Sequence, residues 1–299
     1  MKVCIFSILL AASFLISNIN AQTDDDEIIT VDSSIVVLNA TITDAAGKAV
    51  GGLAQKYFHV YEDGKEQTIV SFQAEETPFA AVILLDTSGS MEERVSLARS
   101  AAIQFLNGLR IDDSAAIYNF DSKVRMVQDF SNSRDIREQV FDLKADGMTV
   151  LNDAVFKAAE MLAKRPEKRK AIIVLSDGAD TMSGRSADKA LQAASLAGAT
   201  IYTVDMSPRI SSARDRMQNQ AVLKNFAEKT GGRFIATPGG VAMRDAFRQI
   251  VEELGAQYTI SFQPLNLKKD GKWRTLELRV ARPNLTIRTR KGYKAQSGK

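Results

Sequence analysis

Hydroxyl and carboxylate side chains gather in three short segments of the chain. The candidates for chemistry are the side chains of Asp86, Ser88, Ser90, Thr149 and Asp177. The first three follow the apolar run 80–85, the last follows the run 171–175, and Thr149 lies in a loop before a helix-like pattern. All five side chains offer oxygen, which is the donor that Mg²⁺ prefers in proteins. We therefore predict that they are ligands of a hard divalent cation.

The sequence offers few side chains suited to other metals or to catalysis. The chain has one histidine, His59, and one cysteine, Cys4, and both lie far from the candidate ligands in the sequence. Zinc and copper sites need nitrogen or sulfur ligands, so we do not expect either metal. A hydrolase would also need a base placed to activate water, and the three segments offer no evident one. The pattern therefore favours a binding site, and we predict that the protein is not an enzyme.

The region from 79 to 254 alternates short apolar runs with longer amphipathic stretches. We expect strands at 80–85, 115–120, 124–127, 171–175, 200–204 and 233–236, and helices at 92–109, 133–143, 151–162, 186–196, 221–229 and 241–254. This alternation predicts an α/β fold with a doubly wound, mostly parallel, Rossmann-like sheet. Ligands of such sheets bind beyond the carboxyl ends of the strands, where the candidate residues lie.

The two flanks of this region are rich in β-branched and aromatic residues. Strand patterns occur at 35–38, 40–43, 57–61 and 68–72 before it, and at 258–262, 274–280 and 285–289 after it. Turns are predicted at Asp63-Gly64 and Asp270-Gly271. An isolated hairpin is marginal in water, so we expect the flanks to join into one small β-sandwich. The predicted domains are 34–78 and 255–299 for the two halves of the β domain and 79–254 for the inserted α/β domain.

The N-terminal segment differs in kind from the rest of the chain. A lysine at position 2, an apolar run at 5–16 and a small residue at 21 predict a signal peptide at 1–21, and an uncut membrane anchor is the alternative. The acidic stretch 22–33 is predicted to be a disordered leader. The only cysteine lies within the signal peptide, so export without disulfides predicts a bacterial protein of the periplasm or cell exterior. No later segment approaches the ~18 apolar residues of a membrane span.

Charge is nearly balanced over the whole chain. The net charge is +3, whereas nucleic-acid-binding domains usually have a strong basic bias, so we expect no nucleic-acid partner. Two local basic runs occur at 164–170 and 268–272. The first is interpreted as a solvated loop, with binding to an acidic surface or to lipid headgroups as the alternative, and the second as a hairpin tip.

The spacing Asp86-x-Ser88-x-Ser90, a later threonine after glycine and a later Asp-Gly resemble the metal-ion-dependent adhesion site of von Willebrand factor A domains. The resemblance implies that Ser88, Ser90 and Thr149 contact Mg²⁺ directly, and that Asp86 and Asp177 act directly or through water. Mn²⁺ and Ca²⁺ are alternatives. One departure is Gly147-Met148-Thr149 where the family often has Gly-Gly-Thr. Segments 58–65 and 290–293 also resemble a bacterial subgroup of exported von Willebrand factor A-related proteins, known mainly from acidobacterial genomes.

The resemblance also implies a function for the site. A sixth position on the metal would stay open for an acidic side chain, so the protein is expected to be an adhesion or protein-interaction module whose partner presents Asp or Glu. The alternative is a structural or assembly factor of the cell envelope. In that case the β domain would be the interface and the metal would only stabilise the fold.

Overall fold

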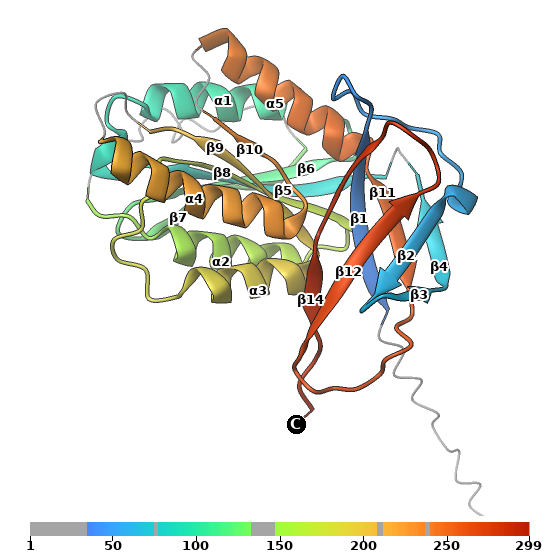
Figure 1. Cartoon of the computed structure of the whole chain (residues 1–299). Coiled ribbons are helices and arrows are strands. Elements are labelled where there is room, and N and C mark those ends of the chain that lie inside the picture. The colour runs from blue at the N-terminus through green and yellow to red at the C-terminus, as the bar shows by residue number, and fades with distance from the viewer. Residues whose placement is uncertain (1–34, 75–76, 133–146, 208–211, 237–239, 299) are drawn as a thin grey trace, which may run out of the picture. The chain divides into compact units, whose positions relative to one another are not determined.

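The computed structural model describes residues 35–74, 77–132, 147–207, 212–236 and 240–298 (Figure 1). The predicted signal peptide, the acidic leader and the expected helix at 133–143 lie outside the described residues. Within the described part of the chain, no helix combines the length and apolar character needed to cross a membrane.

A six-stranded sheet forms the centre of the α/β region. Its strands are β5 (Phe79–Asp86), β6 (Ser114–Phe120), β7 (Val124–Ser131), β8 (Arg169–Ser176), β9 (Ala199–Asp205) and β10 (Phe234–Ile235), in the order β10-β9-β8-β5-β6-β7. Neighbouring strands are parallel except for β7, which lies antiparallel at the edge. Every residue of β5 is buried, as expected for a central strand with both faces covered.

Helices cover both faces of this sheet (Figure 1). The helices are α1 (Val95–Asn107), α2 (Leu151–Ala163), α3 (Ala187–Ala197), α4 (Ala213–Thr230) and α5 (Gly240–Gly255), with a 3₁₀ turn, η2, at Gly89–Met91. Alternate side chains of β5 point to opposite faces. Phe79, Ile83 and their alternates pack in one core with α1 and α5, and Val82, Leu84 and their alternates pack in another with α2, α3 and α4.

The flanking strands form two four-stranded antiparallel sheets. One has the order β13-β1-β11-β4 and the other the order β14-β12-β2-β3. Their bounds are β1 Val36–Thr43, β2 Phe58–Glu62, β3 Lys65–Gln67, β4 Ile69–Gln73, β11 Tyr258–Phe262, β12 Trp273–Val280, β13 Thr286–Thr289 and β14 Gly292–Lys294, with a short 3₁₀ helix, η1, at Gln55–Tyr57. Both sheets contribute to one apolar core. The predicted fold class, an α/β sheet inserted between β segments, is confirmed.

The hairpin turn predicted at Asp63-Gly64 is confirmed, but the strand that returns beside β2 is β3 and not the strand expected at 68–72. The Asp63-Gly64 hairpin joins β2 to β3, and β4 then pairs with β11 in the facing sheet. This switch lets Phe72 pack against Phe58 from the opposite side, with ring centroids 4.9 Å apart.

The segment 268–272 is likewise no isolated hairpin tip. β11 and β12 belong to different sheets, so the Asp270-Gly271 turn does not join paired strands. The segment instead pairs with the chain near its end. Ala295 N–H donates to the Lys272 carbonyl at 2.8 Å, and Gly298 N–H donates to the Lys269 carbonyl at 2.8 Å.

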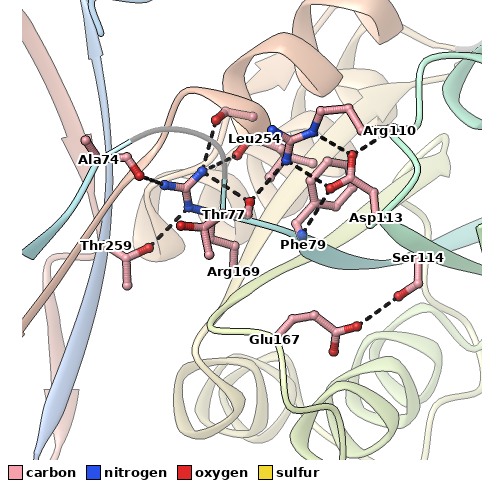
Figure 2. Close-up of polar contacts among 11 residues, drawn as sticks. Ala74, Thr77, Phe79, Arg110, Asp113, Ser114, Glu167, Arg169, Leu254 and Thr259 are labelled. Carbon is pink, nitrogen blue, oxygen red and sulfur yellow. Dashed lines mark hydrogen bonds and ion pairs between the residues drawn. The ribbon is translucent and has the colours of Figure 1, made fainter. Parts of the chain in front are cut away.

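Arg169 corrects the interpretation of 164–170 as a wholly solvated loop. It is the first residue of β8 and is completely buried. Its guanidinium donates to the carbonyl oxygens of Ala74, Thr77, Leu254 and Gly255 and to the Thr259 hydroxyl (Figure 2). These acceptors belong to the two places where the chain passes between the β sheets and the α/β sheet. The backbone carbonyls of both crossings accept hydrogen bonds from the guanidinium, and these bonds offset the cost of burying Arg169.

A second arginine secures the first of these crossings. Arg110 donates to the Thr77 carbonyl at 3.1 Å and to both carboxylate oxygens of the buried Asp113 (Figure 2). Asp113 in turn accepts from the Phe79 N–H at 3.2 Å, at the start of β5. The entry into the α/β sheet is therefore fixed by side chains as well as by strand pairing.

Candidate metal centre

The turn after β5 brings three of the predicted ligands into direct contact. Asp86 is completely buried, and one of its carboxylate oxygens accepts from the Ser88 N–H at 2.9 Å and from the Ser88 hydroxyl at 2.6 Å. The Ser88 and Ser90 hydroxyl oxygens are 3.2 Å apart. This arrangement follows from the sequence, because alternate residues of a tight turn can aim their side chains at one point.

The end of the neighbouring strand β8 contributes Ser176 and Asp177. The Ser176 hydroxyl donates to the second carboxylate oxygen of Asp86 at 2.6 Å. Asp177 is buried next to it, and its carboxylate accepts from the Ala179 N–H at 3.0 Å. Leu85 pairs with Leu175 in the sheet, so the residues that follow both strands lie at the same edge.

Ser176 is a site residue that the sequence analysis missed. The sequence pattern assigns it no role. The signal that identifies it is register: once β5 and β8 are known to be adjacent and parallel, residue 176 lies level with Asp86. That adjacency is a property of the folded sheet, and the local sequence does not contain it.

The loop with Thr149 is held against both neighbouring turns. The Gly147 carbonyl accepts from the Gly89 N–H at 3.2 Å, and the Met148 N–H donates to the Ser122 hydroxyl at 3.1 Å. Gly147 has a φ of +76°, and an added Cβ would lie 2.6 Å from the Ser122 hydroxyl. A glycine is therefore required there. Thr149 itself is buried on this rim, whereas the Met148 side chain is 54% exposed.

Further hydrogen bonds stiffen the rim. The Thr149 carbonyl accepts from the N–H groups of Thr181 and Met182, each at 3.0 Å, and Asp180 accepts from the Asn152 N–H at 2.9 Å. The loop after β8 is therefore tied to the first turn of α2. Thr87 points away from the site and its hydroxyl donates to the Phe120 carbonyl at 3.3 Å. The structure thus unites Asp86, Ser88 and Ser90 by hydrogen bonds and holds Thr149 and Asp177 on adjoining segments.

A second Asp-x-Ser turn at the end of β9 was also missed. Ser207 donates to Asp205 through its N–H at 2.8 Å and through its hydroxyl at 2.6 Å, as Ser88 does to Asp86. Here the other carboxylate oxygen accepts from the Gln220 side-chain amide of α4 at 2.7 Å. This hydrogen bond ties α4 to the end of β9.

The environment of Asp86 fits a cation. Burial raises the pKa of this carboxyl to about 7, against the opposing effect of hydrogen bonds from Ser176 and Ser88, and the nearby charge of Asp177 raises it further. A bound cation would favour the ionised form that burial disfavours. The described residues contain no cluster of three or more His, Cys, Asp or Glu side chains, so such a site depends on the hydroxyls. Oxygen donors of this kind suit Mg²⁺.

The raised pKa predicts how the stability of metal-free protein depends on pH. Asp86 binds its proton more tightly in the folded protein than in the unfolded chain, so the folded state gains relative stability at low pH. This contribution declines as pH rises from about 4 to about 7, by up to a few kcal/mol. The measurement is the urea midpoint in EDTA at about pH 4.5 and about pH 7.5.

Asp86→Asn is the control for this prediction, because asparagine has the same shape and does not titrate. The fall in stability between the two pH values should be smaller in this variant than in the wild type. Equal falls in both proteins would show that Asp86 does not titrate in this range. Added Mg²⁺ should stabilise the wild type more at the higher pH, since a metal binds the ionised carboxylate.

Comparison with known proteins agrees with this architecture. Residues 81–179 match the family model of the von Willebrand factor type A domain. A solved von Willebrand factor type A protein from Catenulispora acidiphila is 16% identical, with a TM-score of 0.51, over 89% of this chain and 75% of that one. Three N-terminal domains of the type V pili tip protein Mfa5 from Porphyromonas gingivalis are 12% identical, with a TM-score of 0.50, over 87% of this chain and 68% of that one.

A mammalian protein also matches part of the chain. Inter-alpha-trypsin inhibitor heavy chain H3 of Mus musculus is 27% identical over 128 residues. The match covers 38% of this chain and 14% of that protein, so the matched segment corresponds to a small part of it. The family model matches residues 81–179, and the α/β region has the von Willebrand factor type A fold.

Proposed function

We propose that the protein is an exported interaction module that binds an acidic side chain of a partner protein through a Mg²⁺ ion. The observation that carries the proposal is the Asp86 carboxylate, which is completely buried and bracketed by the Ser88 and Ser176 hydroxyls at 2.6 Å each. Asp86, Ser88, Ser90, Thr149 and Asp177 would hold the ion. When bound, it would supply an open coordination position for a carboxylate.

The chain's own residues have clear roles in this proposal. Ser88 and Ser176 orient the Asp86 carboxylate, and the Gly89–Gly147 hydrogen bond at 3.2 Å keeps the Thr149 loop beside it. Neutral hydroxyls leave much of the ion's charge without compensation, which attracts a carboxylate from outside. This chemistry is binding, and we do not propose a catalysed reaction.

We propose export to the periplasm or the cell exterior, on the basis of the signal peptide predicted at 1–21. The flanking segments 58–65 and 290–293 support membership of the exported bacterial subgroup that they resemble. The structurally similar Mfa5 is a type V pili tip protein, which supports an adhesive role for this chain. The partner itself is expected to be a protein that presents Asp or Glu.

The test is calorimetric titration of Mg²⁺ and Mn²⁺ into purified protein that has been stripped of metal. One ion is expected per chain. Asp86→Asn should weaken binding by roughly a hundredfold or more, because the variant keeps the hydrogen-bonded shape of the turn and removes the charge. Asp205→Asn is the matched control, since it makes the same change in the second Asp-x-Ser turn and should bind as the wild type does.

The outcomes separate the proposal from its alternatives. Undiminished binding in Asp86→Asn would contradict the assigned site. Ion binding by the wild type that raises the melting temperature but never affects capture of an acidic partner would favour a structural metal in an envelope assembly factor. Loss of partner capture in Asp86→Asn, at an unchanged melting temperature, would support the interaction module.

A further inference from the structure

A hollow of about 400 Å³ lies where the end of α3 meets β1 and the last described segment of the chain. Its lining includes Lys168, Lys170, Lys268, Lys269, Arg290 and Lys294, and we call this feature the basic groove. The two basic runs of the sequence, which seemed unrelated, contribute to the same surface. Glu167 is the one carboxylate residue among its described lining residues.

Most of this positive charge has no compensation in the described part of the protein. Ion pairs within 4.0 Å are absent there for Lys168, Lys170, Lys268 and Lys294. Glu167 is already engaged, because its carboxylate contacts the Arg165 guanidinium at 2.6 Å. It also accepts from the Ser114 hydroxyl at 3.2 Å (Figure 2). Burial lowers the pKa of Lys170, as expected for a cation with too little neighbouring negative charge.

Arg290 adds a recessed cation. Its guanidinium donates to the Val37 carbonyl at 2.6 Å and to the Ser195 carbonyl at 3.1 Å. The buried Nε–H finds no acceptor among the described residues, and burial lowers the pKa of this arginine to about 10. Neutral carbonyls satisfy some of its donors and the Tyr293 ring centroid lies 5.6 Å from it, but no described carboxylate pairs with it. A bound anion would correct this imbalance.

Exposed apolar side chains lie beside these cations. Ile35 is 54% exposed, Leu196 is 69% exposed and Leu267 is 59% exposed, and all three line the basic groove. A second hollow of about 290 Å³ shares Leu196 and Arg290 with it and adds Trp273, which is 51% exposed. Apolar side chains grouped around a hollow are typical of a site that receives side chains of a partner.

We infer that the basic groove binds an extended acidic segment of a partner protein, one that carries aliphatic side chains among its Asp and Glu residues. The lysines would form ion pairs with the carboxylates of the segment. The exposed leucines and isoleucine would pack against its aliphatic side chains. A narrow peptide chain can enter a hollow and reach Arg290. A bilayer surface is broad and flat, so its headgroups would contact the outer lysines but would not reach the recessed Arg290 guanidinium.

This second surface is separate from the candidate metal centre. Lys170 lies near the start of β8, whereas Ser176 at the other end of the same strand contacts Asp86. Six residues of extended strand span about 20 Å. A ligand in the basic groove can therefore be held while the metal rim is engaged, and its binding does not need the metal.

The test is fluorescence anisotropy of a labelled ten-residue peptide of alternating Glu and Leu, with a Gln/Leu peptide of the same length as the probe control. The full chain should bind the Glu/Leu peptide in EDTA, with an affinity that falls as salt is added. The variant Lys168→Glu/Lys268→Glu/Lys294→Glu should bind roughly tenfold more weakly or worse, because three surface charge contacts become repulsive. These lysines are exposed, so the substitutions should leave the fold intact.

The matched control is Lys48→Glu/Lys65→Glu/Lys157→Glu, which makes the same net-charge change at exposed positions away from the groove. It should bind within about twofold of the wild type. Equal losses in the two triple variants, or equal binding of both peptides, would overturn the inference. So would binding of vesicles containing phosphatidylglycerol in the absence of any peptide binding. Peptide binding that disappears in EDTA would instead place the ligand at the metal centre and support the proposed function alone.

Discussion

Replacing Arg169 with methionine is expected to lower the free energy of unfolding by roughly 3–5 kcal/mol. Methionine retains much of the apolar stem but cannot donate a hydrogen bond. The carbonyls of Ala74, Gly255 and Leu254, together with the Thr259 hydroxyl, would lose their donor at a completely buried position (Figure 2). Each buried acceptor without a partner costs about 1–3 kcal/mol, so the losses add to a large effect.

Urea denaturation measures this prediction with two independent signals. The only tryptophan, Trp273, reports on the β sheets through its fluorescence, and far-ultraviolet circular dichroism reports mainly on the helices of the α/β region. The two signals should change together in the wild type, because Arg169 joins both crossings. Arg169→Lys should fall between methionine and wild type, since it retains a donor with less reach.

Arg248→Met is the control for Arg169→Met. Arg248 is 67% exposed and pairs with Asp245 on the surface of α5, so its loss should cost less than about 1 kcal/mol. If Arg169→Met lost no more free energy of unfolding than this control, the carbonyls at the crossings would be hydrogen-bonded to water in the variant. The proposed stabilising role of Arg169 would then be contradicted.

Gly232→Ala is expected to lower the free energy of unfolding by more than about 3 kcal/mol. A Cβ at this position would lie 1.9 Å from the Ile201 carbonyl oxygen, which belongs to the buried strand β9. No side-chain rotation relieves this overlap, because the Ile201 oxygen is a backbone atom. The Gly231-Gly232 pair also ends α4. Gly231 has a φ of +80°, and the Gly232 N–H donates to the Ala227 carbonyl at 2.9 Å. Both β9 and the end of α4 would have to move.

Thermal unfolding followed by circular dichroism measures the effect of Gly232→Ala. Gly184→Ala is the matched control, because the nearest atom to its added Cβ is an Asp153 carboxylate oxygen at 3.8 Å. The control should change stability by less than about 1 kcal/mol. A Gly232→Ala protein that melts at the wild-type temperature would contradict the close approach of α4 and β9.

The main parts of the fold could be predicted because they are local properties of the sequence. The uninterrupted apolar run of β5 predicts a strand buried on both faces, and Asp86 at its end predicts a site at the strand's carboxyl edge. Partner choice in the β sheets was harder. β4 pairs with β11, and this pairing brings together Phe72 and Phe58, a contact between facing sheets that no local pattern predicts.

The site also combines residues that a local pattern predicts with residues that only the folded sheet brings together. Asp86, Ser88 and Ser90 share one turn, so their convergence could be predicted from spacing. Ser176 reaches Asp86 only through the pairing of β5 with β8. The role of Asp205 depends in the same way on Gln220 of α4, which donates to its carboxylate across the fold. Arg169 seemed to be one cation in a solvated run, because the carbonyls that bury it come from segments far away in the sequence.

The arrangement of β1 has a consequence for the order in which the molecule can be made. Its two neighbours, β11 and β13, pair with it through partners such as Leu38 with Ile260 and Ala40 with Thr289. At the usual rate of chain synthesis, roughly 10–50 s separate the appearance of β1 from that of β13. During that time the apolar residues Leu38 and Ile42 have no sheet to join. The sheet that contains β1 can therefore close only after β11 and β13 have been made, and the earliest of the described strands waits for partners that follow the α/β region.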